Sequence, residues 1–490
     1  MKKKYVVLSI ITLVLLIAFV TSFNYFKTTN TYVENNSNNQ TKITKGISMN
    51  LEQTAGAGDY KQVTQSSWPT EGYKFNAELS KCENGGEISW DDTKKAVIVS
   101  GNLSDKCYVY FDIYQLTLAE YIKSQYTGTQ GDNALYYHNS TLTNGAGDNS
   151  YRYAGGDYVL TEAGKATGAT MMIGYNNSVT TALIDFYCNG TKQYVGYASS
   201  CSTSHYYLIK GDTTQYQTYN EALNASVEKG YLTKDNVKNF VCFGSDATTC
   251  PTENLYRIIG VFNNHVKLIK YDYAKSSLLG TDGDFSQEYT SNYFSGEQGE
   301  SPSSNSLYYW NNAGTNTWSA SKLNTVNLNT NFTTNIGTAW ANKIATTTWK
   351  VGGGTYANLR DAVPKTAYQY EVGSSASTTT YDAKIGLMYV SDYYYSASPS
   401  AWTLVGYNSS DATKDYRAAT STNWLYLGSY EWTISRNSDF TDFAFYVSST
   451  GNVNSRSVTL SYAVRPSFNL ESSVNYVSGS GTIENPIRIN

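Results

Sequence analysis

The chain has 490 residues, of which 16% are charged and 46 are tyrosines. Without the four lysines of the first 30 residues, 32 of the 36 basic residues remain against 40 acidic ones, a net charge of −8. This balance argues against nucleic acid as a partner, because binding it requires a basic surface. Aliphatic and aromatic residues are too abundant for a disordered chain, and the length indicates two or three domains.

Residues 1–26 predict a transmembrane anchor. Lysines at positions 2–4 precede an apolar run over residues 5–26, which is close to the ~20 residues that span a bilayer core. Lysines in front of the run predict a cytoplasmic N-terminus and an extracellular remainder. A cleaved signal peptide is the alternative, although no clear A-x-A pattern follows Ala18. We expect a single-pass protein of the cell membrane that contacts the lipid bilayer through residues 5–26, with its C-terminal bulk outside.

Two short regions follow the anchor. Residues 27–50 are rich in Asn, Thr and Ser and predict a flexible linker. Residues 51–115 predict a small β module, with strand-like segments at 94–100 and 107–113 and turn-forming residues between the segments.

Six cysteines fall into three pairs that are close in the sequence. An even number of cysteines in an exported chain favours disulfide bonds, and no C-x-x-C motif is present. Free, buried cysteines that pack as small apolar side chains are the alternative. The expected bridges are Cys82–Cys107, Cys188–Cys201 and Cys242–Cys250.

Residues 116–240 form a mixed α/β middle region. Thr117 and Glu120 have the spacing of a capping box and predict a short helix, and residues 218–221 repeat the signal. The second helix is expected to end at Gly230. The sequence leaves open whether this region is a domain or a long insertion.

Residues 241–490 behave as one larger unit. Two apolar strands at 255–262 and 266–271 are joined by Asn263 and Asn264, a compact hairpin signal. Short helical stretches around Leu323 and Trp340, a strand over 384–390 and a β section from Trp424 onwards follow.

Several short motifs of this unit are similar to a known family. They are Leu255-Tyr-Arg-Ile-Ile-Gly260, Val266-Lys-Leu-Ile269, Trp424-Leu-Tyr-Leu427, Trp432-Thr-Ile-Ser-Arg436, Phe445-Tyr-Val-Ser448 and Val464-Arg-Pro-Ser-Phe468. About half the chain thus resembles a bacterial domain family of unassigned function related to the C-type-lectin-like and formylglycine-generating-enzyme superfamily. The resemblance implies an irregular α+β fold with small sheets and long functional loops. The expected architecture is mainly β / α+β and multidomain, ending in a C-type-lectin-like α+β domain at 241–490.

The catalytic residues of that superfamily's enzymes have no counterpart in this sequence. The oxidase branch uses cysteines late in the domain, and none follows Cys250 here. The iron-dependent branch uses a histidine cluster, whereas His138, His205 and His265 are far apart in the sequence. No G-x-S-x-G or Walker-type motif is present. We predict no catalytic residue, although paired carboxylates on a polysaccharide remain an alternative.

Asp282-Gly-Asp284 is the one place where the sequence could support a cofactor. Two carboxylates at this spacing could contribute to a calcium site, although the ligand count of a known loop is missing. An ordinary turn is the favoured interpretation, so no cofactor is expected and calcium is the alternative.

Tyrosine, asparagine and serine are good contact residues because they combine amphipathic area with adaptable hydrogen bonding. In C-type-lectin-like domains ligands meet the irregular loops near the C-terminal strands, so the resemblance places contacts there. The alternative is that these side chains only pack and form turns. The candidate ligand-binding residues are Tyr393, Tyr394, Tyr395, Asn437, Asp439, Asp442, Phe443, Asn452, Asn454, Arg456 and Tyr462.

Arg465 and Trp432 are expected to be structural. Arg465 lies among apolar strand residues, which predicts a buried arginine paired with an acid. The sequence as a whole favours an extracellular surface protein for adhesion or recognition of a glycan or protein ligand, without enzymatic activity. An envelope enzyme acting on polysaccharide and a structural coat protein are the alternatives.

Overall fold

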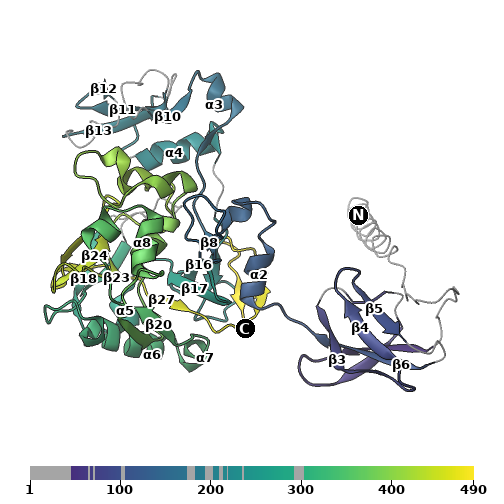
Figure 1. Cartoon of the computed structure of the whole chain (residues 1–490). Coiled ribbons are helices and arrows are strands. Elements are labelled where there is room, and N and C mark those ends of the chain that lie inside the picture. Colours follow the sequence, from purple (N-terminus) through teal and green to yellow (C-terminus); the bar gives the residue numbers. More distant parts are fainter. Residues whose placement is uncertain are drawn as a thin grey trace, which may run out of the picture. The chain divides into compact units, whose positions relative to one another are not determined.

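The computed structural model describes residues 46–64, 67–69, 72–100, 105–173, 182–193, 202–208, 213–217, 219–233, 237–291 and 303–490. These residues form a mainly β protein with several small sheets and short helices (Figure 1). The chain divides into two compact units, residues 1–115 and 116–490. No helix of the described residues has the length and hydropathy to cross a membrane, and the expected anchor at 5–26 lies outside them.

The first unit contains a four-stranded sheet and a separate hairpin. The sheet order is β2 (Tyr60–Val63), β1 (Ile47–Glu52), β6 (Cys107–Ile113) and β3 (Tyr73–Cys82), and the hairpin joins β4 (Glu87–Asp91) to β5 (Ala96–Ser100). Phe75, Trp90 and Phe111 form the aromatic centre of its core. The predicted Cys82–Cys107 disulfide is confirmed, and it joins directly opposed residues of β3 and β6.

The flexible linker predicted for residues 27–50 does not extend to residue 50, because β1 begins at Ile47. Residues 47–50 belong to β1, which pairs in parallel with β6 and antiparallel with β2. The apolar residues Ile47, Met49 and Leu51 alternate with polar ones, and Met49 and Leu51 are buried. This period-2 alternation is typical of a strand with one buried face, and the polar composition of the preceding residues obscured it. Residues 27–45 lie outside the described part of the chain.

The second unit is built on a seven-stranded sheet. Its strands run in the order β22 (Ile385–Gly386), β27 (Ser467–Asn469), β17 (His265–Lys270), β16 (Leu255–Phe262), β8 (Tyr151–Tyr153) and β7 (Leu135–Tyr137), and β15 (Phe240–Cys242) also pairs with β16. Asn263 and Asn264 join β16 to β17 with φ angles of 48° and 67°. A two-residue hairpin turn of this type requires such left-handed residues, and the predicted hairpin is confirmed.

The expected middle region contributes to two cores. Helix α2 (Leu118–Ser124) begins at the predicted capping box, where the Glu120 amide donates to the Thr117 hydroxyl, and β7 and β8 lie in the central sheet. The following residues pack into a separate apolar cluster. Their elements are β9 (Val159–Leu160), α3 (Glu162–Ala166), β10 (Met171–Ile173), β11 (Ala182–Cys188), β12 (Thr191–Gln193), β13 (Ser204–Leu208), α4 (Tyr219–Glu228) and β14 (Leu232–Thr233). This cluster is therefore inserted between two strands of the central sheet.

Small sheets and short helices complete the second unit. The strands are β18 (Phe285–Ser291), β19 (Ser303–Tyr309) and β26 (Ser461–Tyr462); β20 (Thr347–Lys350) and β21 (Thr380–Ala383); β23 (Glu431–Arg436), β24 (Phe443–Val447) and β25 (Val453–Ser457); and β28 (Tyr476–Ser478) and β29 (Arg488–Ile489). The helical segments are η1 (Asp132–Ala134), η3 (Thr252–Asn254), α5 (Ser276–Leu279), η5 (Trp318–Ala320), η6 (Leu323–Phe332), α6 (Thr333–Asn335), α7 (Thr338–Ala341), η7 (Tyr356–Arg360), α8 (Pro364–Glu371), α9 (Val390–Tyr395), η8 (Pro399–Thr403), η9 (Ala412–Lys414) and η10 (Tyr416–Ala419). The strand expected over 384–390 is reduced to β22, because the chain turns into α9 at Val390.

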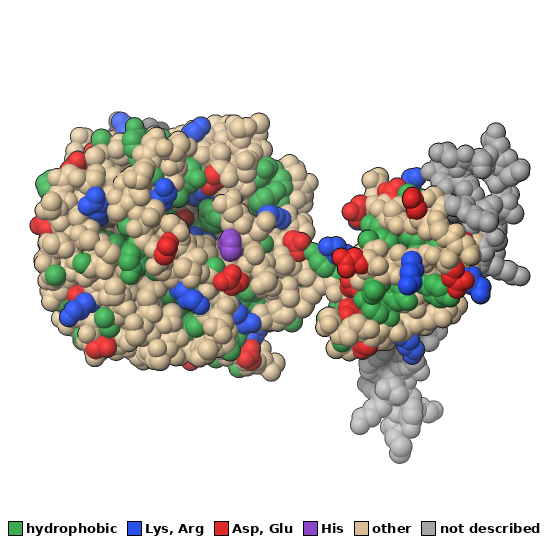
Figure 2. Space-filling view, turned by 60° about the horizontal axis from the view of Figure 1, so that its bottom comes forward, with side chains coloured by type: hydrophobic (Ala, Val, Ile, Leu, Met, Phe, Trp, Pro, Cys, Tyr) green, Lys and Arg blue, Asp and Glu red, His purple; other side chains and the backbone are tan. Residues whose placement is uncertain are grey.

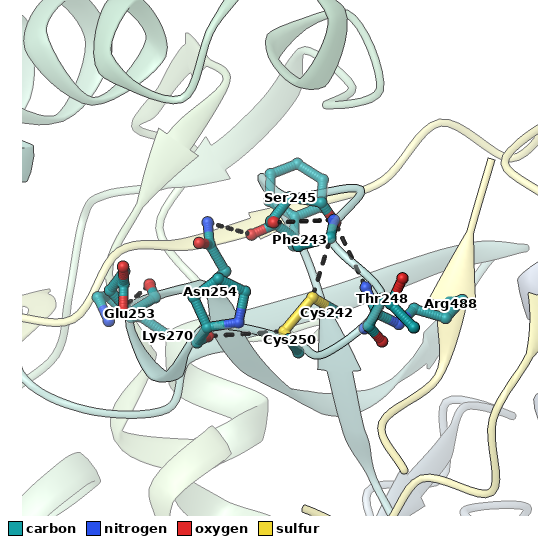
Figure 3. The surroundings of a disulfide bond; sticks show 11 residues. Cys242, Phe243, Ser245, Thr248, Cys250, Glu253, Asn254, Lys270 and Arg488 are labelled. Atoms are coloured by element: carbon teal, nitrogen blue, oxygen red, sulfur yellow. Dashed lines mark hydrogen bonds between the residues drawn. A yellow bond between two sulfur atoms is a disulfide. The ribbon is translucent and has the colours of Figure 1, made fainter. Parts of the chain in front are cut away.

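A second predicted disulfide, Cys242–Cys250, is confirmed and closes the loop that follows β15 (Figure 3). Arg488 of β29 donates from Nη2 to the Thr248 carbonyl in this loop over 2.8 Å. The bridged loop therefore holds the C-terminal strand. The third expected bridge cannot be placed in the same way, because Cys201 lies outside the described residues.

Arg465 and Trp432 lie in the core of the second unit. Arg465 is 1% exposed, and its Nε and Nη2 donate to the two carboxylate oxygens of Glu431 over 2.8 and 2.9 Å. Nη2 also donates to the Leu425 carbonyl over 2.6 Å. The Trp432 indole is buried and donates to the Tyr308 carbonyl over 2.9 Å. Both side chains therefore connect the C-terminal strands to the rest of the unit.

Candidate functional site

Tyr393, Tyr394 and Tyr395 were expected at a contact surface, and the structure corrects this. All three lie on α9 and are 0%, 0% and 1% exposed. Their hydroxyls donate to the backbone carbonyls of Gly451, Leu359 and Asn144 over 2.7, 2.7 and 3.1 Å, respectively. Because the strand expected here ends early, a buried helix carries these rings into the core.

Asn437 and Asn452 are also buried, which corrects their expected role in ligand contact. The Asn437 amide group donates to the Ser455 hydroxyl over 2.9 Å. The Asn452 side-chain oxygen accepts from the hydroxyls of Ser448 and Thr450 within the turn between β24 and β25. The Asn437 side-chain oxygen also accepts from the Asp439 amide over 2.9 Å, so both residues perform the turn chemistry that was the alternative interpretation.

The other six predicted contact residues reach the surface but share no single face. Asp439 and Arg456 are exposed, and Asp442, Phe443, Asn454 and Tyr462 are half-buried. Arg456 pairs with Ala444 across the sheet, whereas Phe443 pairs with Ser457. Successive strand residues point to opposite faces, so Phe443 and Arg456 lie on different sides of β24 and β25. The structure does not assemble these residues with Tyr393–Tyr395 into one surface.

A pocket of about 220 Å³ lies at the central sheet of the second unit. Its walls come from the segment before β8, the β16–β17 hairpin, β20, α8 and the first residues of α9. The lining residues are Asp148, Ser150, Arg152, Phe262, Asn263, Lys267, Thr347, Thr348, Trp349, Lys350, Tyr368, Val372, Tyr389, Ser391, Asp392 and Asn469.

Lys267 and Asp392 form one charged part of this pocket. The side chains are 5% and 3% exposed, and Lys267 Nζ lies 2.5 Å from Asp392 Oδ2. The same oxygen accepts from the Tyr389 amide over 2.8 Å, which fixes the carboxylate at the start of α9. The Nζ atom also lies 4.5 Å from the centre of the Tyr389 ring and 5.3 Å from that of Trp349.

Arg152 and Asp148 form the second charged part. Arg152 is 2% exposed, and its Nη2 donates to Asp148 over 2.6 Å while its Nε donates to the Ser150 hydroxyl over 2.8 Å. The guanidinium lies 4.8 Å from the centre of the Phe262 ring and 5.1 Å from that of Tyr368. Two buried cations, each paired with a carboxylate, are thus enclosed by aromatic rings.

Electrostatics in the pocket follow from this burial and pairing. Burial lowers the pKa of Lys267, while the Asp392 charge opposes the shift. Burial acts to raise the pKa of Asp148, but the Arg152 charge and hydrogen bonds from Ser150 outweigh it and hold the pKa well below its ordinary value. Asp148 is therefore ionised at neutral pH.

Part of the hydrogen-bonding capacity of these groups is unused. Within the described part of the chain, Arg152 Nη1 and Asp392 Oδ1 have no hydrogen-bond partner, and Lys267 Nζ has a single acceptor. An ammonium carries three donors and a guanidinium five. The pocket can thus offer both donors and an acceptor to a ligand beside its aromatic rings.

Sequence reasoning missed this pocket. Lys267 was noted only as part of the hairpin motif, and Arg152 lies in a short strand, Tyr151–Tyr153, that carries no motif. Asp392 is 125 residues from Lys267 in the sequence. The one available signal was a lysine between the apolar residues Val266 and Leu268, which predicts a buried charge that requires a partner.

Two groups of side chains have residue types that could bind a cation, but the contacts of neither group support a cation site. Asp284 is buried and accepts the amides of Asn312 and Leu323, whereas Asp282 is exposed and accepts from Asn331, so the two carboxylates have separate partners. Cys82, Asp105 and Cys107 lie close together, but both sulfurs belong to the disulfide. Calcium at Asp282 and Asp284, the alternative to an ordinary turn, thus gains no support from their contacts.

Comparison with protein-family models, curated proteins and solved structures gave no match for this chain.

Proposed function

We propose that this chain is an extracellular surface protein, anchored in the cell membrane through residues 5–26, that recognises a ligand without transforming it. The C-type-lectin-like assignment of residues 241–490 is part of this proposal. The pocket around Lys267 and Arg152 is the observation that carries it. Its aromatic walls and its few convergent polar groups are typical of small-molecule sites.

The two carboxylates of the pocket favour recognition over hydrolysis. A pair of glycosidase carboxylates needs one acid that is protonated near neutral pH. Asp392 is 2.5 Å from the Lys267 ammonium, and the Arg152 charge helps to keep Asp148 ionised. Asp148 therefore does not have the environment of a general acid, and Asp392 is held by Lys267 rather than by a position for a leaving group.

A neutral, hydroxyl-rich ring is the ligand that fits these groups best. Hydroxyls can donate to Asp392 Oδ1 and accept from Arg152 Nη1, and the apolar face of a sugar ring can pack on Tyr368. An anionic ligand would face two carboxylates as well as two cations. On the face drawn in Figure 2, positive and negative side chains are interspersed. We therefore propose one sugar residue of a glycan as the bound unit.

The volume supports a single residue of a larger chain. About 220 Å³ is below the roughly 300–1,000 Å³ of sites for drug-sized molecules. Asn263 and Thr348 at the pocket are exposed and could contact the neighbouring residues of a glycan.

Glycan-array binding by residues 46–490, followed by calorimetry with the best neutral glycan, tests this proposal. Tyr368→Ala should weaken binding about tenfold, equivalent to ~1.4 kcal/mol, because it removes one aromatic wall. Tyr370→Ala is the matched control on the same helix, since Tyr370 is 40% exposed and does not line the pocket. Equal affinity of both variants would place the binding site elsewhere, and binding of peptides but no glycan would replace the proposed ligand class.

A further inference from the structure

The contact between Lys267 and Asp392 has features beyond those of an ordinary ion pair. Among the ion pairs of the described residues, it is the one lysine–carboxylate pair in which both side chains are less than a tenth exposed. The Lys192–Asp185 pair, by comparison, is 31% and 14% exposed. The buried Arg465–Glu431 pair involves a guanidinium, which stays protonated and is therefore not a nucleophile.

The surroundings of this pair favour a neutral lysine, because burial lowers the pKa of Lys267. Nζ lies within 6.0 Å of three ring centres, those of Tyr389, Trp349 and Phe262. Removing an ammonium from water destabilises its charged form, so Lys267 gives up its proton more readily here than a lysine in solution does. A desolvated lysine amine is a nucleophile.

We propose that Lys267 and Asp392 condense into an intramolecular amide bond between β17 and the start of α9. After the proton has moved, the Nζ lone pair attacks Asp392 Cγ and forms a carbon–nitrogen bond. One carboxyl oxygen leaves with two protons as water, so the ammonium and carboxylate become one amide and one water. The reaction needs no oxidant, reductant or activated co-substrate, and net charge is unchanged.

The geometry supplies what this reaction needs. Nζ already lies 2.5 Å from Oδ2, and effective molarities of roughly 10⁵–10⁸ M are reached when two groups are held in such proximity. The Tyr389 amide donates to the same carboxyl group over 2.8 Å, which orients it and polarises it toward attack. Glu371 accepts the amides of Val390 and Ser391 over 2.9 and 2.8 Å and thereby positions the residues before Asp392.

The bond would join two segments that are 125 residues apart and close a covalent loop through the central sheet. Its carbonyl and its N–H would still provide the pocket with one acceptor and one donor. The proposal rests on the contact of two side chains and is independent of the ligand proposed above.

The mass of the intact protein tests the proposal directly. Residues 46–490 are purified, reduced and alkylated, and their mass is compared with that of the sequence. We expect the protein to be one water lighter, and a tryptic digest to contain a branched peptide that joins Lys267 to Asp392. A protein of full mass, with trypsin cleaving after Lys267, would overturn the proposal.

Two lysine-to-arginine variants control the experiment. Lys267→Arg keeps the positive charge but cannot form the amide, so it should have the full mass of its sequence. Lys192→Arg, at the partly exposed pair with Asp185, should still lose one water. Water loss that persists in Lys267→Arg would assign the modification to another residue and also overturn the proposal. The wild-type mass decides the question even if Lys267→Arg does not fold.

Discussion

Replacing Arg465 by alanine should destabilise the second unit by about 3–5 kcal/mol, the range for breaking a buried ion pair by removing one partner. The variant loses two hydrogen bonds to Glu431 and one to the Leu425 carbonyl. It also leaves the Glu431 carboxylate, 2% exposed, without its counter-charge. Most of the expected loss comes from this stranded charge rather than from the missing bonds.

Thermal unfolding of residues 46–490, followed by calorimetry, provides the assay. At roughly 2.1 cal/mol/K of unfolding entropy per residue over residues 116–490, the loss corresponds to about 4–6 °C in Tm. Because Arg465 lies in the second unit, the transition of the first unit serves as an internal reference. Arg488→Ala is the matched control, since Arg488 is half-buried and donates only to loop carbonyls. Arg488→Ala should lower the free energy of unfolding by no more than about 1 kcal/mol.

The pH dependence of the Arg465 variant separates the stranded charge from lost packing. Burial raises the pKa of Glu431 even with Arg465 beside it, and removing the arginine raises it further. A folded state with the higher carboxyl pKa binds more protons than the unfolded state, so stability falls as pH rises through the window between the two pKa values. The variant should therefore be closer to wild type at acidic than at neutral pH. An unchanged Tm, or a loss that is equal at both pH values, would refute the reasoning.

Three further predictions concern the disulfide, the buried tyrosines and the pocket. The double variant Cys242→Ser, Cys250→Ser should lower the free energy of unfolding by about 2.5 kcal/mol, because the unfolded chain regains the entropy of the open loop. An unchanged Tm of the second unit would contradict this. Tyr393→Phe should lower the free energy of unfolding by about 1–3 kcal/mol, because the buried Gly451 carbonyl loses its donor. Tyr430→Phe, at an exposed ring, should change it by no more than about 0.5 kcal/mol. Similar values for the two variants would refute the burial of Tyr393. Asp148→Asn should make the free energy of unfolding less dependent on pH in the acidic range. The depressed pKa of Asp148 supplies stability that is present above the unfolded pKa and is lost as pH falls through the folded pKa. Measuring the free energy of unfolding as a function of pH checks this.

Local signals in the sequence were sufficient for many elements of the fold. The Thr117–Glu120 capping box, the Asn263-Asn264 hairpin and two of the cysteine pairs depend on residues that are close along the chain, and each lies where it was expected. The strand at residues 47–50 was missed because composition was weighed above periodicity. Local patterns are reliable when partner groups are near neighbours.

The candidate site could not be predicted because its partners are distant. Lys267 contacts Asp392 only when β17 and α9 pack against each other. The two residues are 125 positions apart, so no local sequence pattern predicts the contact. The predicted contact residues failed for a related reason. A run of tyrosines looks the same in the sequence whether it forms an exposed strand or a buried helix, and the early end of β22 decides between them.

The abundance of tyrosine and asparagine therefore has a structural explanation. Irregular loops leave many buried carbonyls without a partner in a sheet or helix, and each needs a donor. Uncharged side chains supply them: the Asn316 amide alone donates to the carbonyls of Asn437, Phe440 and Phe443 over 2.7–2.9 Å. In such a chain the composition of a segment does not mark a ligand site. Buried charges that line a pocket are a better guide, because only 16% of the residues are charged and burying a charge is costly without a partner. Two buried cations and two carboxylates around one pocket are therefore a stronger functional signal than any tyrosine cluster.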